Sequence, residues 1–150
     1  MKRMLLSMTI LTTLIASAPA MAGERDELCA AFATWREALS SGKAENVVQL
    51  YNSDAVLLAT LADEPIINQK ERTAYFTKLT AKKNLKATVN KEFIRVLDED
   101  DAVISGVYTF SFDENGKSVS IPARYTFVYE KQYGEWRIVE HHSSKLPSLK

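Results

Sequence analysis

One arginine and two histidines are the residues in this chain whose positions favour chemistry most. Arg124 interrupts the apolar stretch Ala123–Val128, where an unpaired guanidinium would be costly to bury. Its partner is therefore either a carboxylate, with Glu140 as the first candidate, or the anion of a bound ligand. The sequence leaves both readings open.

His141 and His142 are the only histidines. Neighbouring residues of a strand point to opposite faces, so the two rings cannot act as one pair. No cysteine or carboxylate stands at ligand spacing beside them, and we expect neither a metal nor a cofactor. An inward His141 is either a hydrogen-bonded core residue or a general acid or base.

The familiar motifs of enzymes are missing from the sequence. It contains no phosphate-binding glycine loop, nucleophile elbow, zinc spacing or kinase signature. A length of 150 residues with 46% hydrophobic and 25% charged residues is typical of one globular domain. Nineteen basic and nineteen acidic residues balance to a net charge of zero, which gives no argument for nucleic acid as a partner.

The first 22 residues have the pattern of a cleaved secretory signal. Lys2 and Arg3 precede an apolar run, and Ala20-Met21-Ala22 forms a small-x-small cleavage site. We predict a signal peptide over residues 1–22, one domain over residues 23–150, and a periplasmic or secreted location. An uncleaved anchor and a mature start at Met21 are the alternatives. No later stretch is long and apolar enough to span a membrane.

Helical periodicity dominates the first half of the remaining chain and β-strand patterns the second. Asn68 and Glu71 have the spacing of a capping box, and Asn115-Gly116 favours a tight hairpin turn. The predicted helices are Glu24–Ser41, Ala44–Tyr51 and one beginning after Asn68; the predicted strands are Ala55–Thr60, Lys86–Leu97, Ala102–Phe112, Val119–Glu130 and Trp136–Ser144. This order predicts an α+β fold with the helices on one face of a mainly antiparallel sheet.

If the last hairpin turns without a bulge, residues whose numbers add to about 265 face each other. Arg124 then lies beside His141 on one face, and Tyr129 beside Trp136 on the other. Both faces carry large apolar groups, yet the helices can cover only one. The surplus aromatic face predicts a homodimer or larger oligomer, or alternatively a partly exposed face on a monomer.

Several segments resemble a known family. They are the tryptophan-containing first helix, Asn52–Leu58, Tyr75-Phe76, Ala123–Tyr129 and the stretch from Gly134 to Pro147 with its Trp136, Ile138 and His141-His142-Ser143-Ser144. Together they are similar to the association (hub) domain of calmodulin-dependent protein kinase II and to its SnoaL-like (SgcJ/EcaC-type) relatives in the nuclear transport factor 2-like superfamily.

The resemblance implies a cone-shaped fold, a curved sheet around a long first helix, a pocket in the cone and oligomerisation through the outer sheet face. Carried over by position, Arg124 lies near one of the arginines that line the hub pocket, and Tyr108 and Ser143 replace two others. The resulting ligand-binding set is Arg124, His141, Tyr108, Ser143 and Trp35, suited to a small carboxylate or another polar organic ligand.

Three functions follow as hypotheses. The first is an exported, homo-oligomeric ligand-binding or scaffold domain without kinase activity. The second is an enzyme of the isomerase, dehydratase or hydrolase class that uses His141 as acid or base. The third is an interaction module that binds a partner in the cell envelope.

Overall fold

The computed structural model describes residues 18–147, with side chains from residue 23 onward. Its elements are α1 (Ala18–Ser40), α2 (Ala44–Val48), β1 (Tyr51–Leu58), α3 (Gln69–Thr80), β2 (Lys83–Val96), β3 (Asp101–Glu114), β4 (Lys117–Gln132) and β5 (Glu135–Lys145). Most of the predicted signal segment lies outside the described residues. Helix α1 begins at Ala18, six residues before the predicted start, and Pro19 occupies its first turn, where a missing N–H costs little.

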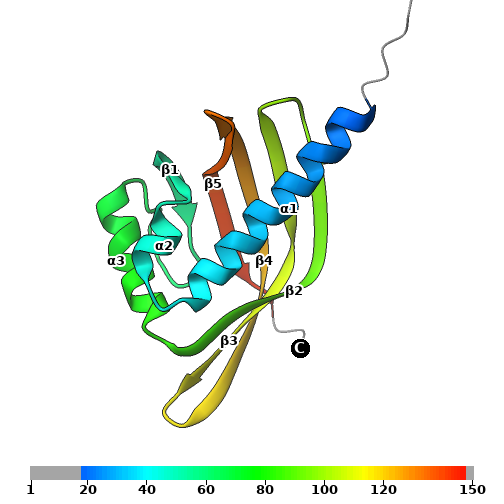
Figure 1. Ribbon diagram of the computed structural model, residues 1–150. Helices are drawn as coiled ribbons and strands as arrows, with labels where there is room; N and C mark the ends of the chain where they lie inside the picture. The colour runs from blue at the N-terminus through cyan, green and yellow to red at the C-terminus, as the bar shows by residue number, and fades with distance from the viewer. Residues whose placement is uncertain (1–17, 148–150) are drawn as a thin grey trace, which may run out of the picture.

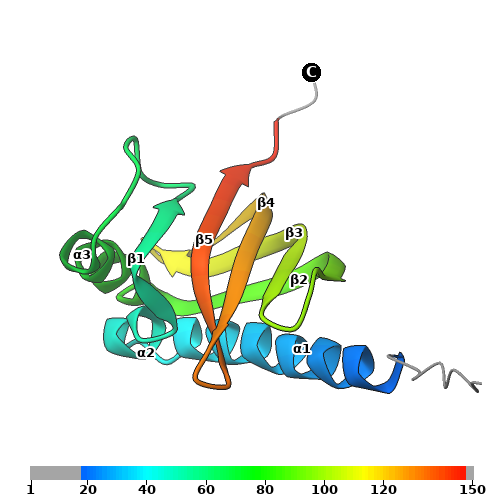
Figure 2. The same ribbon diagram turned by 90° about the horizontal axis from the view of Figure 1, so that it is seen from above.

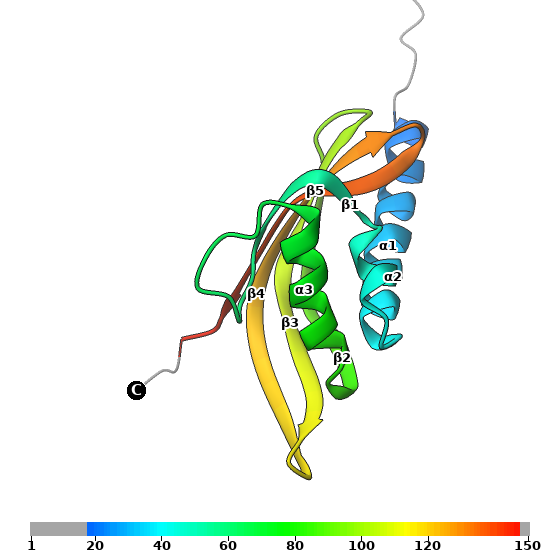
Figure 3. The same cartoon turned by 90° about the vertical axis from the view of Figure 1, so that its left-hand side faces the viewer.

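The five strands form one sheet in the order β1-β5-β4-β3-β2. β1 pairs with β5 in parallel, and every other pairing is antiparallel. Figure 1 and Figure 2 show the three helices on one face of this sheet, and Figure 3 shows the strands curving around them. The predicted α+β class, with helices on one side of a curved and mainly antiparallel sheet, is confirmed.

Two local signals in the sequence have the predicted structural result. The side chain of Asn68 accepts a hydrogen bond from the Glu71 N–H at 3.0 Å and caps α3. Asn115 and Gly116 have φ angles of 53° and 73°, as the tight turn between β3 and β4 requires. Capping and turn chemistry thus set the start of α3 and the register of the longest hairpin.

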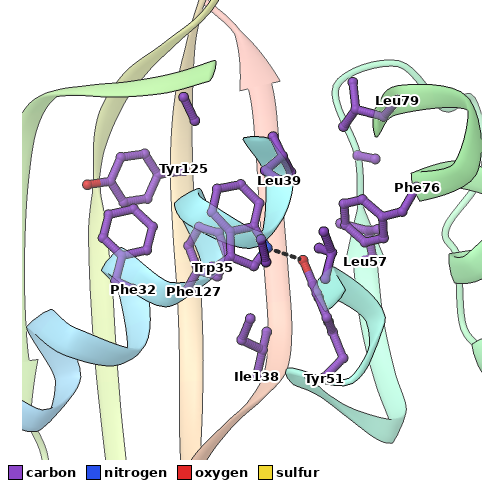
Figure 4. Packing of buried hydrophobic residues seen from close by; sticks show 14 of the residues in the cluster. Phe32, Trp35, Leu39, Tyr51, Leu57, Phe76, Leu79, Tyr125, Phe127 and Ile138 are labelled. Carbon is purple, nitrogen blue, oxygen red and sulfur yellow. Dashed lines mark hydrogen bonds between the residues drawn. The ribbon is translucent and has the colours of Figure 1, made fainter. Parts of the chain in front are cut away.

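Helix α1 contributes a continuous apolar stripe to the core. Leu28, Phe32, Trp35 and Leu39 are at most 1% exposed, at the spacing of one helix face. Figure 4 shows Phe32 and Trp35 against the aromatic residues of β4, where Trp35 meets the Phe127 ring edge-on at 4.9 Å between centroids. This packing covers the concave face of the sheet with little space left inside.

The predicted register of the last hairpin is wrong. The turn between β4 and β5 contains only Tyr133 and Gly134, so Lys131 faces Trp136 and Tyr129 faces Ile138. A register shift follows at Val139, beyond which Phe127 faces His141. The extra residue reverses which side chains of β5 face the helices.

The two faces of the sheet also differ from the expectation. The aromatic face that was expected to be surplus is the face that the helices cover, and its Tyr125, Phe127 and Tyr129 are at most 3% exposed. On the outer face, Val103 lies opposite Val128 in the register of β3 and β4, and Phe93 is 63% exposed. The surface left uncovered by helices therefore carries a small apolar patch of valines and one phenylalanine, with polar neighbours such as Ser105 and Thr126.

A second bulge, at Asn90 in β2, brings two backbones into close contact. The Lys91 carbonyl oxygen lies 1.9 Å from the position that a Cβ on Gly106 would occupy. The Tyr125 hydroxyl donates a hydrogen bond to the same carbonyl at 3.2 Å. Only glycine fits at residue 106, where the strands β2 and β3 meet around the bulge.

Candidate functional site

Four of the five predicted site residues meet in one buried hydrogen-bond chain. The chain runs from Trp35 through Tyr51, His141, Tyr108 and Ser143 to Thr60. Tyr51 and Thr60 had not been predicted as members. Because α1, β1, β3 and β5 each supply at least one of these groups, the chain joins all the layers of the fold.

The distances along the buried hydrogen-bond chain range from 2.5 to 3.4 Å. Trp35 Nε1 lies 3.0 Å from the Tyr51 hydroxyl, which lies 2.8 Å from His141 Nδ1. Figure 4 shows the first of these bonds. On the other side of the ring, Tyr108 lies 3.4 Å from His141 Nε2 and donates to Ser143 Oγ at 2.6 Å. The Ser143 and Thr60 hydroxyl oxygens are 2.5 Å apart.

The donors in this chain fix the tautomer of His141. The indole N–H of Trp35 can only donate, so the Tyr51 oxygen accepts from it and the Tyr51 proton needs another acceptor. His141 Nδ1 is the acceptor in reach, which places the ring proton on Nε2, facing Tyr108. All the bonds then run in one direction, from the indole toward Ser143 and Thr60.

Burial keeps His141 neutral. Its side chain is 3% exposed and stacks on Phe127 at 3.8 Å between ring centroids. Desolvation, with a smaller effect of His142, lowers the pKa of His141 to about 3. A second ring proton would also face the Tyr51 hydroxyl, which already receives the Trp35 N–H. Both ring nitrogens are thus occupied, and no position beside them is open to a substrate.

The two phenols of the chain stay protonated for the same reason. Desolvation is the largest cause that raises the pKa of Tyr51 well above its ordinary value, and it raises the pKa of Tyr108 as well. The arrangement therefore holds neutral donors and acceptors in fixed positions. It supplies no charged acid or base at neutral pH.

Sequence reasoning missed Arg72, which positions Tyr51. Arg72 extends from α3, is 1% exposed, and donates to the carbonyl oxygens of Ala55 at 2.6 Å and Asn52 at 2.7 Å. Its guanidinium lies 5.2 Å from the centroid of the Tyr51 ring. Burial lowers the pKa of Arg72. By satisfying the irregular backbone of β1, this cation holds Tyr51 against His141.

Arg124 does not belong to this group, so its predicted convergence with His141 is wrong. It is exposed and pairs in register with Ser144 on the outer face, whereas His141 faces the helices. The register shift at Val139 is the physical reason, because it moves His141 to the opposite face. The same shift places Glu140 opposite Val128, four residues along β4 from Arg124.

The interior of the cone has little free volume. The apolar cavity beside Thr60, Tyr75 and Phe110 measures about 10 Å³, roughly the space of one water molecule. Ser143 instead lines a surface cleft of about 220 Å³ that the loop Ala62–Pro65 closes on one side. Of the five predicted residues, Ser143 is the one that reaches this cleft.

Among residues 18–147, no helix has the length and hydropathy needed to cross a membrane. In the same part of the chain, no three His, Cys, Asp or Glu side chains gather in a way that could hold a metal ion.

The comparisons with known proteins place this geometry in a family. The family model of the calcium/calmodulin dependent protein kinase II association domain matches residues 24–147. A structure from Xanthomonas campestris, described as a candidate member of that class, is 44% identical, with a TM-score of 0.78 over 82% of this chain and 88% of its own. No curated protein matches the chain significantly.

More distant structures share the fold alone. The association domain of Caenorhabditis elegans CaMKII is 20% identical, with a TM-score of 0.69 over 83% of this chain and 98% of its own. A structure from Streptomyces avermitilis, described as a candidate dehydratase of the NTF2-like family, is 14% identical, with a TM-score of 0.76 over 85% of this chain and 99% of its own.

Proposed function

Because the chain belongs to the calcium/calmodulin dependent protein kinase II association domain family, we propose that it is a self-associating scaffold domain that performs no chemistry of its own. The observation that carries this proposal is the contrast between the two faces of the sheet. The helix-covered face is filled by aromatic rings and the buried hydrogen-bond chain, while the outer face carries apolar side chains that no described helix covers.

The outer face carries a small apolar patch among polar residues. Val103 and Val128 lie side by side at its centre, Val107 follows on β3, and the exposed ring of Phe93 stands at its edge. An aliphatic centre with charged residues such as Arg124 around it is typical of surfaces that bind another protein. A second copy of the same sheet matches this surface, as in other symmetric homo-oligomers.

The buried hydrogen-bond chain supports the same role. Its neutral groups are paired with one another, so they add rigidity and a defined packing without an open catalytic position. A rigid sheet presents a constant outer surface to its partner. In this proposal His141 is a structural residue and does not act as the general acid or base that the enzyme hypothesis requires.

We expect the chain from Gly23 onward to sediment as a dimer or larger at about 10 μM, and Val103→Asp to weaken this association at least tenfold. The introduced carboxylate would be desolvated between two copies, at a cost of several kcal/mol. Analytical ultracentrifugation over a concentration series measures both states. Ser118→Asp, on the same face of the sheet but in β4 beside the turn that joins β3 and β4, is the matched control. A wild-type monomer at about 100 μM would contradict the proposal.

We also propose that the domain is exported after removal of residues 1–22. Ala20-Met21-Ala22 supports cleavage before Gly23. Intact-mass measurement of the protein from the periplasmic fraction is expected to show a chain that starts at Gly23, and Ala22→Arg is expected to block cleavage. Glu24→Gln, outside the motif, serves as the control. A soluble product that retains Met1 is the result that rules the proposal out.

A further inference from the structure

A groove runs between helix α1 and the free edge of the sheet. β2 is the last strand of the sheet order, so one side of its backbone has no neighbouring strand. Figure 2 shows α1 running beneath this strand. The groove measures about 450 Å³ and is lined by Ala33, Arg36, Glu37, Ser40, Ser41, Lys86, Ala87 and Thr88. It lies on the helix side of the molecule, away from the proposed self-association surface.

Arg36 points to the kind of group that this groove can hold. Its guanidinium lies 5.6 Å from the centroid of the Phe32 ring, and its Nε is buried without a hydrogen-bond partner among the described residues. Among the described residues, none of the ion pairs includes Arg36. The guanidinium is half-buried and forms no ion pair, so its terminal N–H groups are suited to a carboxylate, which can accept two hydrogen bonds at once.

The strand beside Arg36 is positively charged. Lys83, Lys86, Lys91 and Arg95 are exposed on β2, and Glu92 is its one acidic residue. Within the groove itself, Arg36 and Lys86 stand against the single carboxylate of Glu37. The groove therefore carries a net positive charge and attracts an anionic partner.

The positive charge of β2 favours some partners for its free edge and disfavours others. A second copy of β2 is repelled, because its lysines would meet the same lysines; lysine on an edge strand is a common protection against such pairing. An extended peptide of opposite charge escapes this repulsion. It can also use the unpaired backbone groups of the strand, which a nucleic acid cannot match by strand addition.

We propose that the groove binds an extended acidic segment of a partner protein, which adds as a strand along Lys86–Val89 and places a carboxylate on Arg36. The register shift after Val89 interrupts the straight edge, so the bound segment is short, about five residues. Backbone hydrogen bonds provide part of the affinity. The side chains of the bound segment that face the helix side meet Arg36, while Lys86, on the opposite face of β2, adds to the positive charge of the edge, and together they provide the preference for acidic sequences.

The test uses the folded chain from Gly23 onward and a fluorescein-labelled heptapeptide in which valine and glutamate alternate. Fluorescence anisotropy at low salt is expected to show binding with a Kd below about 100 μM. Arg36→Gln and Lys86→Gln are each expected to weaken binding at least fivefold. Lys117→Gln, an exposed lysine in the distal hairpin, is expected to leave it unchanged. Thermal unfolding of each variant verifies that the fold persists.

Two further probes separate strand addition from simple charge attraction. A heptapeptide with alternate amides N-methylated keeps its charge but loses its backbone donors, and we expect it not to bind. A lysine-valine heptapeptide is also expected not to bind. Equal binding of the methylated peptide, tighter binding of a single-stranded oligonucleotide, or full binding by Arg36→Gln would each overturn the proposal.

Discussion

Acidification from pH 6.5 to pH 4.5 is expected to remove about 1.4 kcal/mol of folding free energy per pH unit through His141 alone. The pKa of this residue is about 3 in the folded chain, below the ordinary value of 6.5 that applies after unfolding. Between these two values the unfolded chain binds the proton and the folded chain does not. The stabilisation is therefore complete above pH 6.5 and is lost progressively as the pH falls toward 3.

Urea unfolding at a fixed protein concentration and a series of pH values measures this slope. His141→Gln removes the titrating ring and is expected to flatten the dependence between pH 6.5 and 4.5, although it lowers stability at pH 7. His142→Gln is the matched control, because His142 is exposed and one residue away. A slope that persists in His141→Gln would show that another group causes the acid sensitivity and that His141 is not buried as described.

Replacing Gly106 by alanine is expected to cost about 3 kcal/mol or more of folding free energy. The new Cβ would lie 1.9 Å from the Lys91 carbonyl oxygen and 2.9 Å from the Tyr125 hydroxyl. The first of these neighbours is backbone, so it cannot rotate away as a side chain could. Relief requires the bulge in β2 to move, which also breaks the hydrogen bond from Tyr125 to Lys91.

Differential scanning calorimetry or urea unfolding of Gly106→Ala gives this result directly. Ser105→Ala, the preceding residue on the outer face, is the control and is expected to change stability by less than about 1 kcal/mol. If Gly106→Ala does not fold, Tyr125→Phe tests the same region with a smaller change, because it removes only the hydrogen bond from Tyr125 to the Lys91 carbonyl. Wild-type stability in Gly106→Ala would mean that the two strands do not approach as closely as described.

The sequence was most informative where one local interaction decides the structure. Asn68 caps α3 and Asn115-Gly116 turns the long hairpin because both effects depend on adjacent residues only. The family resemblance, confirmed over residues 24–147, supplied the cone-shaped architecture. Predicted helices and strands accordingly lie close to those of the structure, with the largest differences at the ends of α1 and β1.

The candidate site was harder to predict because the face to which a strand residue points depends on the number of residues between it and the turn. One inserted residue at Val139 turns His141 to the helix-covered face, while Arg124 stays on the outer face. The sequence drew attention to both residues but not to this separation. No residue pattern marks this bulge. The two-residue turn was also hard to predict, because Tyr133 adopts a positive φ of 53°. Glycine or asparagine is the usual residue at such a position and would have indicated the turn more clearly.

Arg72 shows a second limit of sequence reasoning. Within α3 it follows Glu71 and reads as a residue of the solvated face. Its burial depends on the carbonyl groups of Asn52, Ser53 and Ala55, which become available only because β1 is irregular. Arg72 donates to backbone carbonyl groups and not to a carboxylate, so no acidic residue in the sequence indicates that it is buried.

The parallel pairing of β1 with β5 has a consequence for the timing of folding. Tyr51 meets Ile138 in that pairing and hydrogen-bonds His141, a residue 90 positions later in the chain. Such contacts form late, because a long loop must close first. The nascent polypeptide therefore cannot complete its core before β5 has been synthesised and can pair with β1.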